Sequence, residues 1–217
     1  SVSANFSRSG EGVRYNNSCN DINQNTATSR NFTCTIGMHY FDLNASWTIT
    51  VTATDLGNLS FFQNLTTVFN YGSLQAIVIQ PNQLTWTSAS PGAVNRTSNN
   101  DPTTINNTGN YNFIGINVSV NDLYGETNTT VNIGAGNVTI GNSTGSSVEC
   151  DFSPNNLNGN STVMGNGTGI AIKQTVLSRG NNSPNNGFTG QEQIYYCFRT
   201  IPANIQSQTY STLNGGT

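Results

Sequence analysis

Side chains that commonly carry out acid–base or nucleophilic chemistry are few in this chain of 217 residues. It contains one histidine (His39), one lysine (Lys173) and ten carboxylates: Asp21, Asp42, Asp55, Asp101, Asp122, Asp151, Glu11, Glu126, Glu149 and Glu192. Most of the carboxylates fall in predicted turns, where Asp is common for conformational reasons. A Ser/His/Asp triad would have to use His39, and no Gly-X-Ser-X-Gly motif is present. We therefore expect no enzyme and no cofactor.

Three other kinds of chemistry stay open, each with a simpler interpretation beside it. A glycosidase needs two carboxylates that meet in space, and the sequence identifies no such pair. Asp151–Asn160 is rich in oxygen ligands but lacks the alternating acids and closing Glu of a calcium loop, which favours a hydrated turn over a metal site. Lys173 could form an isopeptide bond with an asparagine, but no partner is defined. His39 has no second ligand or base beside it, and we expect it to be solvated.

Modification of asparagine is the chemistry that the residue spacing favours most. The chain has 36 Asn, and fifteen of them begin an Asn-X-Ser/Thr sequence that accepts an N-linked glycan in secreted proteins. Chance alone would give about eight or nine such sequences at this composition. At several of them X is apolar (Phe6, Phe32, Leu59, Leu65, Val118 and Val138), which in a strand directs the Asn toward solvent. The predicted acceptors are Asn5, Asn16, Asn31, Asn44, Asn58, Asn64, Asn95, Asn106, Asn117, Asn128, Asn137, Asn142, Asn160, Asn166 and Asn181.

The composition limits the partners and the compartment of the protein. Charged residues make up 8% of the chain and the net charge is −3, so neither nucleic acid nor an anionic membrane surface is an expected partner. No segment reaches 18 apolar residues, so no membrane span is predicted. The chain starts at Ser1 rather than Met, and we expect an extracellular mature protein whose signal peptide has been removed.

Four cysteines, Cys19, Cys34, Cys150 and Cys197, allow three pairings. Metal binding is disfavoured because no Cys-X-X-Cys occurs and His39 is distant in sequence. We expect two disulfides, and the pairs Cys19–Cys34 and Cys150–Cys197 keep each bridge within one predicted domain.

The elements that carry these residues are predicted to be strands throughout. Ser46–Thr54 places Trp47, Ile49, Val51 and Ala53 on one side and four threonines on the other, which is typical of a half-buried strand. No segment has a convincing helical period. Many short strands with frequent turn signals predict an all-β protein of two immunoglobulin-like antiparallel β-sandwich domains, stapled by disulfides. The other predicted strands are 1–7, 31–40, 59–71, 74–80, 84–87, 103–106, 111–120, 131–140, 148–152, 169–177, 193–201 and 208–213.

The predicted domains are 1–73 and a larger one, 74–217, with the boundary near Gly72. Leu74–Gln80 is nearly continuously apolar. That pattern fits either a strand buried on both faces or one that locks two domains together.

Two stretches carry a resemblance to a known group of proteins. Cys34-Thr-Ile-Gly-Met-His-Tyr-Phe-Asp followed by Trp47-Thr-Ile-Thr-Val-Thr-Ala-Thr-Asp resembles immunoglobulin-like modules of secreted archaeal surface proteins, which are frequent in small-genome uncultivated archaea. Leu84-Thr-Trp, Gly92, Ser98-Asn-Asn-Asp-Pro and Asn106-Asn-Thr-Gly-Asn are similar to the start of the sandwich that follows in those proteins, and Tyr210-Ser-Thr to its final strand. The resemblance implies fold and compartment rather than activity. The segment before Cys19 is short for a complete module, so the first sandwich is expected to lack a strand of its own.

These observations lead to one main hypothesis and two alternatives. The main hypothesis is a structural subunit of an extracellular, N-glycosylated filament, pilus-like, whose copies polymerise by donor-strand exchange. Ser1–Ser7 is the expected donor strand, with Val2, Ala4 and Phe6 inserted into the neighbouring copy, and Gln206–Leu213 is the alternative donor. The other hypotheses are a surface adhesin or carbohydrate-binding module and an S-layer component.

Overall fold

Ser46–Thr54 forms strand β5 in the computed structural model, with the bounds that its alternation predicts. The structure describes residues 1–23, 26, 28–55, 57, 60–87, 89–142, 150, 161–172, 175–179 and 190–213, and for residues 60–66 only the course of the backbone. Apart from one short 3-10 helix, η1 (Ala135–Asn137), every element in these residues is a β-strand. The chain is therefore all-β, as the sequence predicts.

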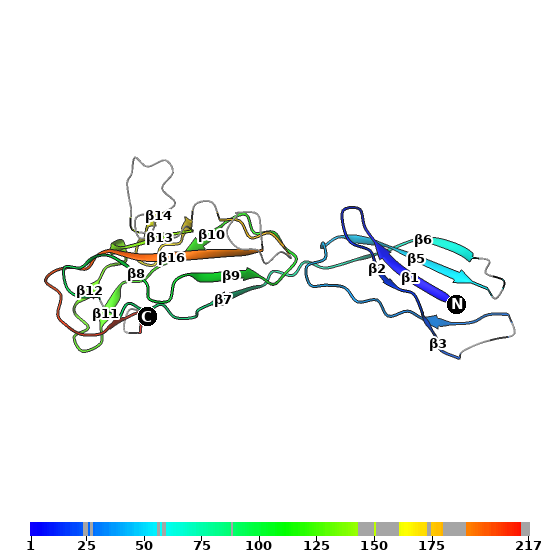
Figure 1. Cartoon of the computed structure of the whole chain (residues 1–217), viewed down its shortest axis with the longest axis horizontal. Helices are drawn as coiled ribbons and strands as arrows, with labels where there is room; N and C mark the ends of the chain where they lie inside the picture. The colour runs from blue at the N-terminus through cyan, green and yellow to red at the C-terminus, as the bar shows by residue number, and fades with distance from the viewer. Residues whose placement is uncertain are drawn as a thin grey trace. The chain divides into compact units, whose positions relative to one another are not determined.

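The chain divides into two compact units (Figure 1). The first comprises residues 1–75 together with 109–111, and the second comprises residues 76–108 and 112–217. Asn110 joins the first unit because its Oδ1 accepts from the main chain of Leu74 at 2.6 Å and its Nδ2 donates to Gly72 at 2.9 Å. The sequence order alone does not predict this return of the chain.

The first unit is built on a four-stranded antiparallel sheet in the order β2-β1-β5-β6. Its strands are β2 (Arg14–Asn16), β1 (Val2–Ser7), β5 and β6 (Ser60–Asn70), and β3 (Asn20–Asp21) pairs separately with β4 (Phe32–Thr33). Among the described side chains of this sheet only Ala4 and Trp47 are buried. Ile49 and Val51 are half-buried and Ala53 is exposed, so the predicted inward face of β5 is covered only at Trp47.

The second unit contains a six-stranded sheet around β16 (Gln191–Thr200), the orange strand of Figure 1. The order is β14 (Ser161–Val163), β13 (Val138–Gly141), β16, β9 (Thr103–Asn107) and β7 (Ile77–Gln80), and β8 (Val94–Thr97) also pairs with β16. Residues 194–198 of β16 are all buried. β9 and β8 pair with successive halves of one edge of β16, and between them the Asp101 carboxylate accepts from the main-chain N–H of Tyr196 at 3.3 Å.

Two smaller sheets complete the second unit. β10 (Ile116–Val118) pairs with β15 (Ile170–Ile172), and β11 (Leu123–Gly125) pairs with both β12 (Asn132–Ile133) and β17 (Tyr210–Ser211). Ile172 and Ile133 from these sheets join a core cluster with Ile105, Ile140, Ile194 and Phe198 from the large sheet. The packing of the second unit is thus far more extensive than that of the described part of the first.

Several predicted strands are shorter than expected or are not formed. Residues 84–87 form no strand, residues 111–120 form only β10, and residues 122–128, which fall between two predicted strands, contain β11. The predicted strand 148–152 lies outside the described residues, apart from Cys150. The interpretation of Leu74–Gln80 as a strand buried on both faces is wrong, because β7 is an edge strand whose four residues are all exposed.

Both predicted disulfides are formed, between Cys19 and Cys34 and between Cys150 and Cys197. Two disulfides suggest an oxidising, extracellular environment.

None of the helices in the described residues is long and apolar enough to cross a membrane.

Candidate functional site

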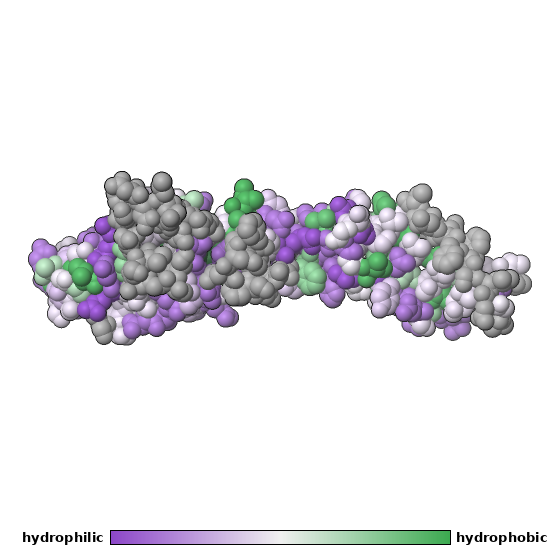
Figure 2. Space-filling model, turned by 45° about the horizontal axis from the view of Figure 1, so that its top comes forward, coloured by the Kyte–Doolittle hydropathy of each residue, from purple (hydrophilic) through white to green (hydrophobic). Residues whose placement is uncertain are grey.

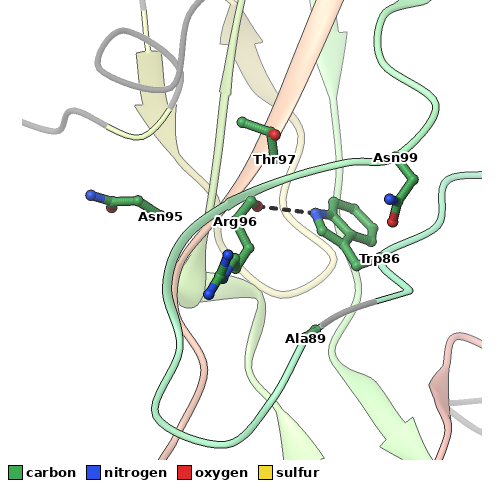
Figure 3. Close-up of a pocket in the computed structure, with 6 residues that line it drawn as sticks. All are labelled: Trp86, Ala89, Asn95, Arg96, Thr97 and Asn99. Atoms are coloured by element: carbon green, nitrogen blue, oxygen red, sulfur yellow. Dashed lines mark hydrogen bonds between the residues drawn. The ribbon is translucent and has the colours of Figure 1, made fainter.

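A small pocket on the second unit is lined by a tryptophan and by an arginine, Trp86 and Arg96 (Figure 3). The indole N–H of Trp86 donates to the main-chain oxygen of Arg96 in β8 at 3.1 Å. The Trp86 ring also packs on Phe198 of β16, with ring centroids 4.6 Å apart. These two contacts fix the ring, and the pocket is lined by Trp86, Ala89, Asn95, Arg96, Thr97 and Asn99.

The polar groups of this pocket leave several hydrogen-bond donors available. Asn99 Oδ1 accepts from the main-chain N–H of Thr87 at 2.6 Å and lies 3.2 Å from its hydroxyl, which leaves the Asn99 Nδ2 for another partner. The guanidinium of Arg96 is exposed and makes no hydrogen bond with the described residues. Asn95 points away from Trp86 in Figure 3 and has a left-handed backbone with φ of 51°. An aromatic ring beside free amide and guanidinium donors is a combination that binds hydroxylated or anionic ligands.

The size of the pocket limits what it could hold. Its volume is about 170 Å³, below the range of about 300–1,000 Å³ that is usual for pockets of drug-sized ligands and cofactors. It is therefore suited to a single small ring or to a side chain of another molecule.

The carboxylates serve as structural acceptors where their contacts are described. Asp42 binds Arg14, Asp101 binds Ser98 and Tyr196 in the main chain, and Asp122 accepts from the main chain of Ala135 at 2.8 Å. Glu149 and Asp151 lie outside the described residues.

Glu192 is a buried acidic residue that the sequence places among ordinary carboxylates. It is fully buried, and its Oε1 accepts from the main-chain N–H of Val176 at 2.9 Å. Its Oε2 has no hydrogen-bond partner within the described part of the chain. Burial raises the pKa of this carboxyl, although the hydrogen bond from Val176 opposes the change. The sequence signal that could have predicted the burial of Glu192 is its position two residues before the apolar run of β16.

The other candidates for metal or nucleophilic chemistry are not brought together. His39 is exposed and stacks on Phe41 with ring centroids 4.9 Å apart. Asp151–Asn160 and Lys173 lie outside the described residues. In the described ranges, no group of three or more His, Cys, Asp or Glu side chains is placed to hold a metal ion.

Eleven of the predicted glycan acceptors have described side chains, and none of them is buried. Asn31, Asn95, Asn117 and Asn166 are exposed, whereas Asn5, Asn16, Asn44, Asn106, Asn128, Asn137 and Asn142 are half-buried. The expected alternation holds around Asn117, where Val118 lies inward and Ser119 is exposed. It fails at Asn137, because both Val138 and Thr139 are buried in β13, between β14 and β16. Asn58, Asn160 and Asn181 lie outside the described residues, and Asn64 is placed only as backbone in β6.

The predicted donor strand is paired with strands of its own chain. Val2–Ser7 is β1, and it pairs with β2 on one edge and with β5 along its whole length on the other. Ala4 is buried, Val2 and Phe6 are half-buried, and Phe6 meets Phe69 edge to face at 4.7 Å. In the alternative donor, Gln206–Leu213, only β17 is a strand, and it pairs with β11.

Comparison with known proteins gives no relative: no protein-family model, curated protein or solved structure matches the chain.

Proposed function

We propose that the chain is a structural subunit of an extracellular, N-glycosylated surface filament, pilus- or thread-like, whose neighbouring copies exchange strand β1. The observation that carries the proposal is the pairing of β1 (Val2–Ser7), which lies between β2 and β5 in the sheet of the first unit. An identical strand from another copy can make the same contacts, so exchange preserves every hydrogen bond. A head-to-tail exchange that does not close into a ring produces a fibre.

The packing of β1 lowers the free-energy cost of detaching it from its own sheet. Ala4 is its one buried side chain and Val2 and Phe6 are half-buried, so less apolar surface becomes exposed than on release of a core strand such as β16. The strand also pairs with β2 and β5, and a neighbouring copy can replace these main-chain hydrogen bonds. The connection to β2 passes through Arg8–Val13 and includes Gly10 in a left-handed conformation with φ of 82°. These six residues could span about 20 Å when extended.

The surface chemistry supports an extracellular polymer rather than a soluble cytosolic protein. The described acceptor asparagines are exposed or half-buried, and glycans on them would cover a surface that has little charge to keep copies apart. The face shown in Figure 2 is mainly polar with separate apolar patches. We further propose that both units are immunoglobulin-like sandwiches of the kind that the archaeal surface proteins contain.

A pair of engineered cysteines tests whether β1 crosses between copies. Ala4 lies opposite Val51 in the β1–β5 register. The main chains of Ser1 and Thr54 exchange hydrogen bonds, so the alternation makes Ala4–Val51 a non-hydrogen-bonded pair. Such pairs have Cα atoms about 4.5 Å apart, which suits a disulfide. In filaments of the double variant Ala4→Cys/Val51→Cys, we expect a ladder of covalent multimers on a non-reducing gel.

A monomer carrying an internal disulfide, with filaments still present, would contradict the exchange of β1. Each single cysteine variant serves as a control and should give no ladder. Deletion of residues 1–7 should abolish filaments, and added peptide of this sequence should cap the subunits. If filaments persist after the deletion, Gln206–Leu213 becomes the donor to test. Flat lattices in place of fibres under the electron microscope would favour an S-layer component.

A second candidate function, binding of a carbohydrate by a surface adhesin, is favoured by the pocket at Trp86. A sugar ring could stack on the indole while its hydroxyls accept from Arg96 and Asn99. Titration with monosaccharides should quench or shift Trp86 fluorescence in the wild type, and Arg96→Ala should weaken the response. Absence of any response across neutral and acidic sugars would remove this candidate.

A further inference from the structure

β7 is an edge strand, and within the described part of the chain it lacks the usual protection against pairing with another strand. Ile77, Val78 and Ile79 are 47%, 42% and 46% exposed, although all three are large and apolar. Among the described strands β7 pairs with β9 alone, and it lies at the end of the six-stranded sheet, beyond β9 in Figure 1. Soluble proteins usually protect such edges with Lys, with Pro or with a covering segment. The four residues of β7 carry no charge and no proline.

The hydrogen-bond alternation shows which main-chain groups point away from the sheet. The N–H of Thr108 donates to the main-chain oxygen of Ala76 at 3.0 Å, so Ala76 faces β9. With the register Val78↔Asn106 and Gln80↔Thr104, residues 78 and 80 also direct their N–H and C=O groups toward β9. The N–H and C=O groups of Ile77 and Ile79 therefore point outward, and no described residue bonds them. An open hollow of about 620 Å³, lined by Ile79, Gln80, Pro81 and Asn82, lies at the end of the strand.

On the core face of the sheet, side chains are buried in β9 but exposed in β7. Ile79 lies opposite Ile105, so it shares the face of the sheet that carries the core cluster. Ile105 is buried, whereas Ile77 and Ile79 are nearly half-exposed. A further strand beside β7 would continue the main-chain ladder and would cover these two side chains.

We propose that β7 pairs with β7 of a second copy, antiparallel and across a two-fold axis at Val78. In this arrangement Ile77 faces Ile79 of the partner copy in a hydrogen-bonded pair, and both outward N–H and C=O groups of each strand are satisfied. The two Val78 side chains face each other as a non-hydrogen-bonded pair. The strand fits its own copy because the register is symmetric, and because an uncharged strand does not repel itself.

The area of this contact determines whether it can hold two isolated subunits together. Four residues per copy bury much less than the roughly 1,200–2,000 Å² of a stable protein–protein interface. The contact is therefore weak between isolated subunits and becomes strong when many copies are aligned, because the contacts act together. In the proposed filament it would join neighbouring fibres side by side into bundles. This consequence rests on the proposed function, whereas the pairing of two copies does not.

Single cysteine variants test the pairing directly. All four native cysteines are in disulfides, so a new cysteine is the one free thiol. At the two-fold axis the Cα atoms of Val78→Cys in two copies would be about 4.5 Å apart, within disulfide reach. In Ile77→Cys the two new thiols lie on a diagonal of about 7–8 Å and should not join. Under mild oxidation of concentrated subunits, we expect Val78→Cys to form a covalent dimer and Ile77→Cys to stay monomeric.

Matched charge variants separate specific pairing from random collision. Ile79→Lys added to Val78→Cys should abolish the dimer, because it places a charge at the interface. Ile114→Lys introduces the same charge at a side chain that is 93% exposed outside any strand, and should leave the dimer unchanged. Peptide mapping verifies that Cys150–Cys197 remains intact. Equal dimer from Ile77→Cys and Val78→Cys, or a dimer that survives Ile79→Lys, would overturn the proposal.

The same variants distinguish this inference from the filament proposal. Wild-type fibres should bundle, and Ile79→Lys should give single fibres of unchanged structure. Fibres that bundle equally in Ile79→Lys contradict the β7 contact alone. Failure to form any fibre, with the Val78→Cys dimer still present, contradicts the filament proposal alone.

Discussion

Arg14 and Asp42 form a two-pronged ion pair inside the first unit. The Nε of Arg14 lies 3.2 Å from Oδ1 and 3.0 Å from Oδ2 of Asp42, and Nη2 of Arg14 also donates to Oδ1. The main-chain N–H of His39 donates to Oδ2 at 2.7 Å. Asp42 is fully buried. Burial by itself would raise the pKa of Asp42, but the hydrogen bonds from Arg14 and His39 outweigh it and hold this pKa below its ordinary value.

The first prediction concerns acid stability of the first unit. Because the pKa of Asp42 is lower in the folded state than in the unfolded chain, the pair stabilises the fold above the ordinary pKa of about 4. That stabilisation is lost as pH falls through the folded-state pKa. At pH 7, Asp42→Asn should lower the free energy of unfolding by about 3 kcal/mol, because the guanidinium loses its partner. The difference from wild type should shrink below about pH 4.

The readout and control for this prediction both come from the first unit. Trp47 is buried there, so its fluorescence in a Trp86→Phe background reports unfolding of this unit. Asp21→Asn removes a more exposed ion pair, in which Arg30 Nη1 lies 3.4 Å from Asp21 Oδ2. Its effect should be at most about 1 kcal/mol. Equal losses from Asp42→Asn and Asp21→Asn would show that the buried pair has no special role.

The second prediction concerns Glu192, whose pKa moves in the opposite direction. Burial raises it, so folding favours the protonated carboxyl, and the fold loses stability as pH rises from the unfolded pKa through the folded pKa. Glu192→Gln keeps an acceptor for the Val176 N–H and removes the ionisation. It should stabilise the second unit at pH 7 on the order of 1 kcal/mol. Denaturant unfolding followed by Trp86 fluorescence in a Trp47→Phe background measures the change.

An exposed glutamate provides the matched control for Glu192. Glu126→Gln removes the same charge at the surface and should change stability by less than about 0.5 kcal/mol. Below about pH 4 the Glu192→Gln variant and wild type should have similar stability, since both side chains are then neutral. A stability difference independent of pH would contradict the argument.

Local alternation in the sequence predicts strands well where both neighbours are also strands, as in β5 and β16. It does not predict Arg14–Asp42, because the two residues are 28 positions apart and neither has a local signal. The pocket at Trp86 depends on a loop and on β8, which has no apolar alternation. β7 shows a different limit: an apolar run signals contact with something apolar, but does not say whether that partner belongs to the same chain.

The third prediction orders the glycan acceptors by access to the amide nitrogen. Asn95, Asn117 and Asn166 are exposed, and their Nδ2 atoms make no hydrogen bond with the described residues. Asn128 Nδ2 donates to Gln206 at 3.0 Å and Asn137 Nδ2 donates to Gly134 at 3.1 Å, and both residues are half-buried. Glycopeptide mass spectrometry of native material should give higher occupancy at the first three sites. Equal occupancy at all five would show that attachment precedes folding.

The fourth prediction concerns Gly125, where β11 meets the C-terminal strand β17. A Cβ added at Gly125 would lie 2.5 Å from the main-chain oxygen of Asn128 and 2.3 Å from Gln208 Nε2. Gln208 also holds the 127–128 turn, because its Oε1 accepts from the main chain of Thr127 at 2.9 Å and of Asn128 at 2.8 Å. Gly125→Ala should therefore displace β17 and destabilise the second unit by about 1–3 kcal/mol.

Limited proteolysis measures this displacement and bears on the choice of donor strand. Gly125→Ala should make residues 206–213 cleavable under conditions where the wild type resists, whereas Gly115→Ala, which adds a Cβ with no atom within 4 Å, should not. If β1 is the exchanged strand, Gly125→Ala filaments still form, because β17 stays within its own copy. If Gly125→Ala abolishes filaments while the rest of the second unit stays folded, the exchanged strand is instead Gln206–Leu213. In that case β17 of one copy docks on β11 of the next, and the added Cβ at Gly125 removes this docking site.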